Sequence, residues 1–312
     1  MARRELGPAA LRVAQAVAAA LPGEPFVVGC SGGADSLALA LGARWAASMA
    51  GVDFVAVVVD HGLQSGSEVV ARGVADVLAE CGIAAEVRRV DVAGGGSVEA
   101  SARDARLGAL ASGGRPVLLG HTLDDQAESV LLGLARGSGV RSLAGMAPRR
   151  GLFVRPLLGL RRATTEQACA EWGVRPWADP HNADERFARV RVRRSVLPVL
   201  EAELGPGIAE ALARTAALAR ADADAFDSAT PRHEGDPRVA WLVGLDPAVR
   251  SRALRAWLLE NGVETTSGQL ASVGALVTDW RGQKGVDVRG GRVVRVDGLL
   301  RWRPARPLDE SV

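Results

Sequence analysis

The segment Val27–Leu41 constrains the fold most, because an apolar strand passes through a glycine pair directly into an apolar helix. This arrangement gathers several backbone N–H groups around one point, where the helix dipole also favours negative charge. The two glycines permit a close backbone approach that a side chain would block. We therefore interpret the turn as a phosphate-binding loop, made of Ser31, Gly32, Gly33, Ala34, Asp35 and Ser36. Within it, Ser31 and Ser36 offer hydroxyl donors, and the Asp35 carboxylate suits a Mg²⁺ ion between phosphates.

Two widespread phosphate-binding motifs are missing from the sequence. The chain has no G-x-x-x-x-G-K-[ST] and no G-x-G-x-x-G, so neither the Walker loop nor the dinucleotide fingerprint applies. A glycine-rich turn between a strand and a helix, capped by a serine, is the simpler alternative for this loop.

Short apolar runs alternate with helical patterns through the first half of the chain. Strands are expected at Phe26–Gly29, Phe54–Val59, Glu86–Val90 and Pro116–Gly120, and helices at 36–49, 67–81, 98–112 and 124–136. Near-continuous apolar strands of this kind predict an α/β fold, a Rossmann-like parallel sheet with helices on both faces. Ligands of such sheets bind beyond the carboxyl ends of the strands. The motifs at those ends are the phosphate loop, Asp60-His61-Gly62, the residues from Asp91 onward, and His121 to Glu128.

The stretch Gly120–Glu128 places a histidine and three acids directly after an expected strand. Asp125 and Glu128 are three residues apart and Asp124 and Glu128 four, so on a helix these acids share a face. A helix start explains Asp124 or Asp125 as a cap near the positive end of the dipole. It explains His121 and Glu128 less well. We therefore interpret the stretch as a negatively charged pocket for a metal or a cationic substrate.

After Arg162 the strand–helix alternation stops. Helices are expected at 164–172, at 186–200 with an end at Pro198, and at Ile208–Phe226, and the polar stretch Asp227–Pro237 is typical of a linker. Two more helices, Pro247–Asn261 and Ser267–Trp280, precede a hairpin formed by Val286–Arg289 and Val293–Val296. The pattern predicts a catalytic domain over 1–215 and a small basic α+β domain over 216–312.

Positive charge is unevenly distributed and is almost entirely arginine, since Lys284 is the only lysine. Residues 236–306 hold twelve Lys and Arg against seven Asp and Glu, although the whole chain has a net charge of only +2. Six arginines and no acid lie between Arg141 and Arg162. Planar guanidinium groups suit phosphates and bases, so these clusters indicate a polyanionic partner such as a nucleic acid.

Composition excludes several other classes of protein. No apolar run approaches the roughly 18 residues that a membrane span needs, and polar residues interrupt the N-terminal stretch. We therefore expect no membrane association, no signal peptide and a cytoplasmic location. The chain has three cysteines, Cys30, Cys81 and Cys169, and none of them forms a C-x-x-C pair. This spacing disfavours a local zinc or iron–sulfur site.

The S-G-G-x-D-S loop resembles the PP-loop of the ATP pyrophosphatase superfamily, whose members cleave ATP between the α and β phosphates and adenylate an oxygen. Further motifs, in order along the chain, resemble those of the tRNA(Ile)-lysidine synthase family over residues 24–200. The C-terminal part matches only by size and position. The matching positions are Asp60–Leu63, Glu99, Ala102, Arg103, Arg106, Gly120–Glu128, Arg136–Gly139, Arg155–Leu158, Asp179, Pro180, Asn182, Phe187, Arg189 and Arg193.

The resemblance implies an ATP-dependent ligase that modifies tRNA. Family members attach free L-lysine to C2 of the wobble cytidine, position 34, in the isoleucine tRNA with a CAU anticodon. ATP first adenylates the C2 oxygen and pyrophosphate leaves. The lysine ε-amine then displaces AMP, and codon reading changes from AUG to AUA. The resemblance further implies Mg²⁺ as a cofactor and a homodimer in some members.

The same resemblance assigns roles to the matching residues. The Ser31–Ser36 loop would hold the departing pyrophosphate, with Asp35 on Mg²⁺. Asp60 and His61 would contact the adenine or ribose of ATP. The catalytic set would include His121, with Asp125 and Glu128 holding the lysine ammonium and helping to remove its proton. Phosphate or tRNA would be bound by four arginines, Arg103, Arg106, Arg189 and Arg193.

Three positions depart from the family pattern. Thr122 stands where a histidine is often found, which puts any catalytic role of a second histidine in doubt. Leu107 replaces a common tyrosine and Val190 an expected asparagine. None of these changes removes a phosphate-loop or acidic residue.

Three alternative functions stay open at this point. A related tRNA thiolase would share the ATP chemistry but usually needs paired cysteines. An amide-forming synthetase acting on a metabolite would not require the basic C-terminal region or the D-D-Q-x-E block. A nucleotide-binding module without catalysis would bind ATP and release no pyrophosphate.

Overall fold

The computed structural model describes residues 6–60, 62, 66–90, 98–137, 139–177 and 184–305, with the side chains of 98–100 left out. The chain divides into two compact units. The first unit comprises Met1–Arg136 and Ser142–Ala217, and the second comprises Gly137–Arg141 and Leu218–Val312. None of the helices in the described ranges is long and apolar enough to cross a membrane.

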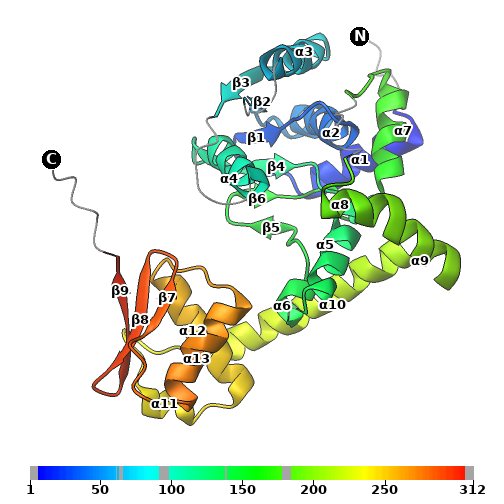
Figure 1. The fold of residues 1–312 in the computed structure, drawn as a ribbon. Helices are drawn as coiled ribbons and strands as arrows, with labels where there is room; N and C mark the ends of the chain where they lie inside the picture. Colours follow the sequence, from blue (N-terminus) through cyan, green and yellow to red (C-terminus); the bar gives the residue numbers. More distant parts are fainter. Residues whose placement is uncertain are drawn as a thin grey trace. The chain divides into compact units, whose positions relative to one another are not determined.

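A six-stranded sheet in the order β3-β2-β1-β4-β6-β5 forms the centre of the first unit (Figure 1). Its strands are parallel except for the edge strand β5, which pairs antiparallel with β6. This confirms the predicted fold class. The strands are β1 (Phe26–Gly29), β2 (Phe54–Asp60), β3 (Ala85–Arg89), β4 (Val117–Leu119), β5 (Arg149–Arg150) and β6 (Phe153–Val154).

Helices cover the sheet, and β1 shows how both faces are buried. Phe26 and Val28 belong to the core that includes α1 and α2, whereas Val27 between them packs with Val117 and Leu110 in another core. Alternate side chains of one strand thus enter two cores, as a doubly covered sheet requires. The helices of this part are α1 (Pro8–Ala19), α2 (Ala34–Ala50), α3 (Ser67–Glu80), α4 (Val98–Ala111), α5 (Leu123–Ala135) and α7 (Arg162–Trp172). The short helix α6 (Val140–Leu143) has residues in both units.

Both ends of each of the four predicted strands lie within one residue of the observed ends. Both ends of each of the four helices predicted in this part lie within two residues of the observed ends. The strands β5 and β6 were not predicted. Each has only two residues, which is too short for a period-two pattern to show in the sequence.

The predicted helix end at Pro198 is wrong. One helical run continues from α8 (Ala188–Arg191) through a π-helical turn, Val192–Val196, into α9 (Leu197–Leu204). Pro198 lies in the first turn of α9, directly after the π turn. A proline nitrogen donates no hydrogen bond and its ring crowds the preceding turn, and the wider π turn accommodates both.

The last long helix, α10 (Ile208–Ala229), extends three residues beyond the predicted Phe226, so the predicted linker starts too early. In the second unit, three helices pack with a three-stranded antiparallel sheet around their own core, which includes Leu254, Leu276 and Leu300. The predicted hairpin is confirmed as β7 and β8, and β9 adds a strand that was not predicted. The elements are α11 (Val239–Val243), α12 (Pro247–Glu260), α13 (Ser267–Thr278), β7 (Val286–Val288), β8 (Gly291–Val296) and β9 (Leu299–Pro304).

Candidate active site

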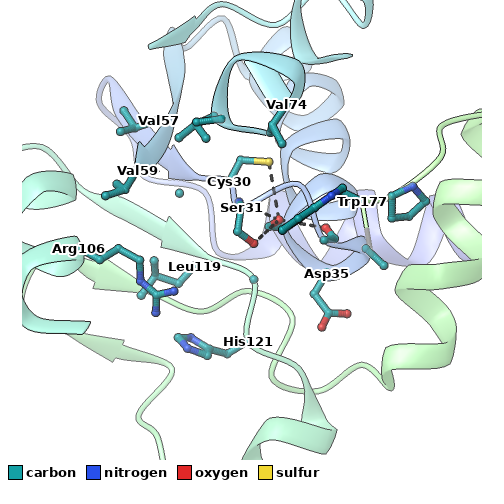
Figure 2. Close-up of a pocket in the computed structure, with 18 of the residues that line it drawn as sticks. Cys30, Ser31, Asp35, Val57, Val59, Val74, Arg106, Leu119, His121 and Trp177 are labelled. Carbon is teal, nitrogen blue, oxygen red and sulfur yellow. Dashed lines mark hydrogen bonds between the residues drawn. The ribbon is translucent and has the colours of Figure 1, made fainter. Parts of the chain in front are cut away.

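A cleft of about 820 Å³ opens in the first unit at the carboxyl ends of β1, β2 and β4 (Figure 2). Residues of the phosphate loop, the β4–α5 junction and α7 line it, together with an apolar wall that includes Val57, Val70 and Val74. Three of the four motifs predicted at strand ends therefore contribute to one cavity. The fourth, from Asp91, lies outside the described residues, as far as Ser97.

The loop between β1 and α2 is held in shape by the hydroxyl of Ser36. That hydroxyl donates to the carbonyl of Gly33 at 3.0 Å and accepts the amide of Ser31 at 3.1 Å. Helix α2 begins at Gly33 as N-cap without a side-chain cap, so its first amides remain available to an anion. Gly32 has φ +85°, and a Cβ there would lie 2.4 Å from Val74 Cγ2, so no other residue fits this turn.

Gly120 brings the phosphate loop against the end of β4. A Cβ on Gly120 would lie 2.9 Å from the carbonyl oxygen of Asp35 and 3.1 Å from Cα of Ser36. The missing side chain thus allows the start of α2 to contact the strand that leads into the acidic stretch. Figure 2 shows Asp35 and His121 on neighbouring sides of the cleft that results.

Thr122 caps α5 and fixes the position of Asp125. The Thr122 hydroxyl and amide both donate to Asp125 Oδ2, at 2.9 and 2.8 Å, in a capping box. Burial alone would raise the pKa of Asp125, but Arg162 and the Thr122 amide outweigh burial and lower it. At position 122, where relatives often have a histidine, this chain therefore has a threonine that caps α5.

Three carboxylates and two guanidinium groups form a partly buried cluster beside the loop. Arg193 donates to Glu128 at 2.6 and 3.1 Å and to Asp125 at 3.4 Å. Arg162 lies 2.8 Å from Asp125, 3.1 Å from Asp35 and 3.6 Å from Glu128. Glu128 is fully buried. Counted as ionised groups, three carboxylates and two guanidinium groups give the cluster a formal charge of −1.

The third acid of the stretch lies outside this cluster. Asp124 accepts the amide of Arg162 at 2.7 Å and pairs with Arg161, which also pairs with Glu210. Among the three acids, the structure therefore separates Asp124 from Asp125 and Glu128.

Asp35 accepts the Thr165 hydroxyl on one oxygen and Arg162 Nε on the other. Burial raises the pKa of Asp35, against the opposing effect of Arg162. No group of three or more metal-ligating side chains occurs within the described ranges. Asp35 nevertheless fits Mg²⁺ as a single protein ligand, because Mg²⁺ usually takes one or two carboxylates together with phosphates and water.

A neighbouring side of the cleft carries a histidine and arginines. Burial lowers the pKa of His121 to about 3, so its imidazole is neutral, and its Nδ1 has no hydrogen-bond partner in the described part of the chain. Arg106 lines the cleft, and its Nε likewise has no partner there. Burial lowers the pKa of Arg106, and the charges of Arg103 and Arg189 lower it further. This side therefore favours an anion.

The remaining predicted residues divide between the cleft and other places. Asp60 lines the cleft and accepts the amide of Gly62 at 3.0 Å. Arg189 donates to the hydroxyl of Ser129 at 3.3 Å. The predicted contact His61 and the motif residues Leu63, Asp179, Pro180 and Asn182 lie outside the described residues, as does the side chain of Glu99.

Sequence reasoning missed Arg162, Thr165 and Trp177. Trp177 lines the cleft and its amide donates to the carbonyl of Gly32 at 3.0 Å (Figure 2). Arg162 lies 127 residues from its partner Asp35. The run of arginines without acids that ends at Arg162 is the only signal in the sequence, and by itself it indicates a polyanion rather than a carboxylate partner.

A parallel sheet with an anion-binding loop at the end of its first strand defines the class of this protein. The family model of the PP-loop domain matches residues 8–200, so this is an ATP-binding PP-loop protein. A second model, the TilS substrate binding domain, matches residues 238–301.

Curated relatives identify the family within this class. The chain is 52% identical to the tRNA(Ile)-lysidine synthase of Rhodococcus erythropolis, covering 91% of this chain and 90% of that protein. It is 49% identical to the tRNA(Ile)-lysidine synthase of Cutibacterium acnes, covering 96% and 98%. The chain belongs to the tRNA(Ile)-lysidine synthase family and is an enzyme.

A solved structure supports the fold. The U34-tRNA thiolase NcsA from Methanococcus maripaludis, with its [4Fe-4S] cluster, superposes with a TM-score of 0.55 over 68% of this chain and 80% of that one. Sequence identity is 17%, so the likeness concerns the fold alone.

Proposed function

We propose that this protein ligates lysine to C2 of cytidine 34 in the isoleucine tRNA with a CAU anticodon, through an adenylated cytidine. The observation that carries the proposal is the contact at Gly120, which sets an anion-binding loop beside a cluster with one surplus negative charge. One side suits pyrophosphate and the other suits an ammonium group. A ligase that uses ATP and lysine needs both.

In the first step, the C2 oxygen of the cytidine attacks the α-phosphorus of ATP and the bond to pyrophosphate breaks. The amides at the start of α2 and the hydroxyls of Ser31 and Ser36 would hold the departing pyrophosphate. Asp60 would contact the adenosine part, and Arg106, with Arg103 and Arg189 nearby, would bind phosphate or the tRNA. When bound, Mg²⁺ on Asp35 would neutralise phosphate charge.

In the second step, the lysine ε-nitrogen attacks C2, a C–N bond forms, the C–O bond breaks and AMP leaves. Asp125 and Glu128 would hold the ammonium group and accept the proton that it must lose before attack. The lowered pKa of Asp125 keeps this carboxylate charged for binding. His121 would offer its neutral Nδ1 as a hydrogen-bond acceptor beside them. Arg193, which shares both carboxylates, would contact the adenylate once lysine enters.

We propose residues 1–215 as the catalytic domain and 216–312 as the domain that binds the tRNA backbone. A homodimer is a further proposal, and sedimentation equilibrium tests it directly. A cytoplasmic location follows from the tRNA substrate and stays a prediction.

One assay tests the reaction. The protein is incubated with ATP, Mg²⁺, labelled lysine and an isoleucine tRNA transcript with a CAU anticodon, and AMP, pyrophosphate and label on the tRNA are followed. We expect all three products. Pyrophosphate release without label on the tRNA would overturn the lysine assignment, and ATP binding without pyrophosphate would favour a non-catalytic module.

Paired variants test the pocket. Asp35→Ala is expected to abolish pyrophosphate release, and Asp125→Asn to raise the KM for lysine while tRNA affinity stays the same. Asp124→Asn is the matched control, because Asp124 lies next in sequence but pairs with Arg161 outside the cluster. Equal effects of the two asparagine variants on lysine KM would contradict the pocket.

A further inference from the structure

Arg162 is the one guanidinium group, among the described residues, that contacts both the phosphate-loop carboxylate and the acids of α5. Its Nε lies 3.1 Å from Asp35, its Nη2 2.8 Å from Asp125 and its Nη1 3.6 Å from Glu128. Arg193 contacts the two α5 acids and not Asp35. Each nitrogen of Arg162 thus faces a different carboxylate.

The backbone of Arg162 is fixed independently of its side chain. Arg162 is the first residue of α7, and its amide donates to Asp124 at 2.7 Å. Thr165, one turn later, donates its hydroxyl to Asp35. Arg161 on the other side pairs with Asp124 and Glu210. The guanidinium can therefore change partners while the start of α7 stays in place.

The two sides of the cluster would bind ligands of opposite charge. MgATP carries net negative charge, so its phosphates at the α2 loop attract the guanidinium away from the α5 acids. Asp125 and Glu128 then lose a positive partner and bind an ammonium group more strongly. The surplus charge of the cluster moves to the side where lysine would bind.

We propose that Arg162 is a positioning residue that couples the ATP side of the cleft to the lysine side, so that bound MgATP strengthens lysine binding. The inference rests on the proposed function, because it takes Asp125 and Glu128 as the lysine site. If Arg162 only neutralised the three acids, bound MgATP would leave lysine binding unchanged.

Equilibrium dialysis with labelled lysine tests the coupling. The Kd for lysine is measured without nucleotide and with saturating Mg²⁺ and α,β-methylene-ATP, which cannot be cleaved between the α and β phosphates. For the unaltered protein we expect the nucleotide to tighten lysine binding by about fivefold or more, the lower end of typical coupling. In Arg162→Met the ratio of the two Kd values should fall to about one.

Two further variants separate coupling from structure. Arg162→Lys should restore only part of the ratio, because one ammonium group cannot bridge three carboxylates as the planar guanidinium does. Arg161→Met, the matched control, should keep the full ratio, since Arg161 contacts Asp124 and Glu210 instead. Circular dichroism checks that each variant is folded.

The outcomes distinguish this inference from the proposed function. If the unaltered protein binds no lysine under either condition, the proposed lysine site and the inference both fail. If it binds lysine with equal Kd values, or if a folded Arg162→Met or Arg162→Lys keeps the full ratio, the inference alone is overturned.

Discussion

At the scale of single residues, burial decides which charge a side chain carries in this cleft. His121 would take up a proton near pH 6.5 in the unfolded chain, whereas its folded pKa is about 3. Between these values the unfolded state binds more protons, so stability falls as the pH drops below 6.5. The imidazole in the cleft therefore stays neutral throughout the physiological range.

This difference predicts how the stability of His121→Gln depends on pH. Lowering the pH from 7.5 to 5.5 should destabilise the unaltered protein by about 1.4 kcal/mol more than the variant, which has no group to titrate at this position. The difference in unfolding free energy is measured by urea unfolding. Hydrogen exchange of the amides in β1 and β4 serves as the probe, so that only the first unit is observed. Parallel pH profiles of the two proteins would show that His121 is not held neutral by the fold.

Gly120 gives a second prediction at the residue scale. A methyl group there meets the backbone of Asp35 and Ser36, which cannot move aside as a flexible side chain would. We expect Gly120→Ala to cost about 1–3 kcal/mol in stability and to lower kcat/KM at least tenfold, because the loop and the acids shift apart. Gly108→Ala on α4 is the control, since its methyl group meets open space. Equal activity of the two variants would refute the role of the contact.

Some residues of the cleft were predictable and others were not. Asp35, Asp125 and Glu128 follow expected strands within recognisable local patterns, and their placement could be inferred from the topology of a parallel sheet. Arg162 and Thr165 reach Asp35 across more than a hundred residues, from the start of a helix whose own pattern shows nothing unusual. Local sequence patterns do not record which distant side chain will neutralise a buried acid.

At the scale of elements, the start of α5 is set by one hydroxyl. Thr122 is fully buried, and its hydroxyl donates to Asp125 while lying 3.5 Å from the Asp125 amide. Thr122→Val keeps the shape but removes the cap, so we expect a loss of about 1–2 kcal/mol and a higher lysine KM as the Asp125 carboxylate loses a donor. Thr122→Ser should keep both values near those of the unaltered protein. Chemical unfolding and lysine titration of the two variants provide the comparison.

The element that sequence reasoning placed least well is the helical run from Ala188 to Leu204. Pro198 was expected to end it, because a proline interrupts the hydrogen bonds of a regular α-helix. The π turn at Val192–Val196 removes this conflict. It also contains Arg193, which pairs with Glu128. π turns have no distinct sequence pattern, so neither the continued helix nor the position of Arg193 could be predicted.

At the scale of the whole molecule, each unit has its own core and its own charge character. In the first unit, buried acids are paired with arginines inside the cleft. In the second unit, exposed arginines lie on and beside the small sheet. Arg289 and Arg303 are exposed and have no ion pair within the described residues, whereas Arg292 pairs with Asp287. The unpaired cations of the second unit are therefore free to bind phosphate.

The last prediction concerns the salt dependence of tRNA binding. Each arginine that binds a phosphate releases counterions, so the affinity for tRNA should fall linearly with salt on a double-logarithmic plot. Replacing both Arg289 and Arg303 by alanine should weaken binding and reduce the slope by about one for each arginine that no longer neutralises a phosphate. Arg72→Ala is the matched control, because Arg72 is an exposed arginine of the first unit that already pairs with Glu68. Filter binding at several salt concentrations gives the slopes. If the double variant keeps the slope of the unaltered protein while Arg72→Ala reduces it, the phosphates bind to the first unit, and the basic character of the second has another cause.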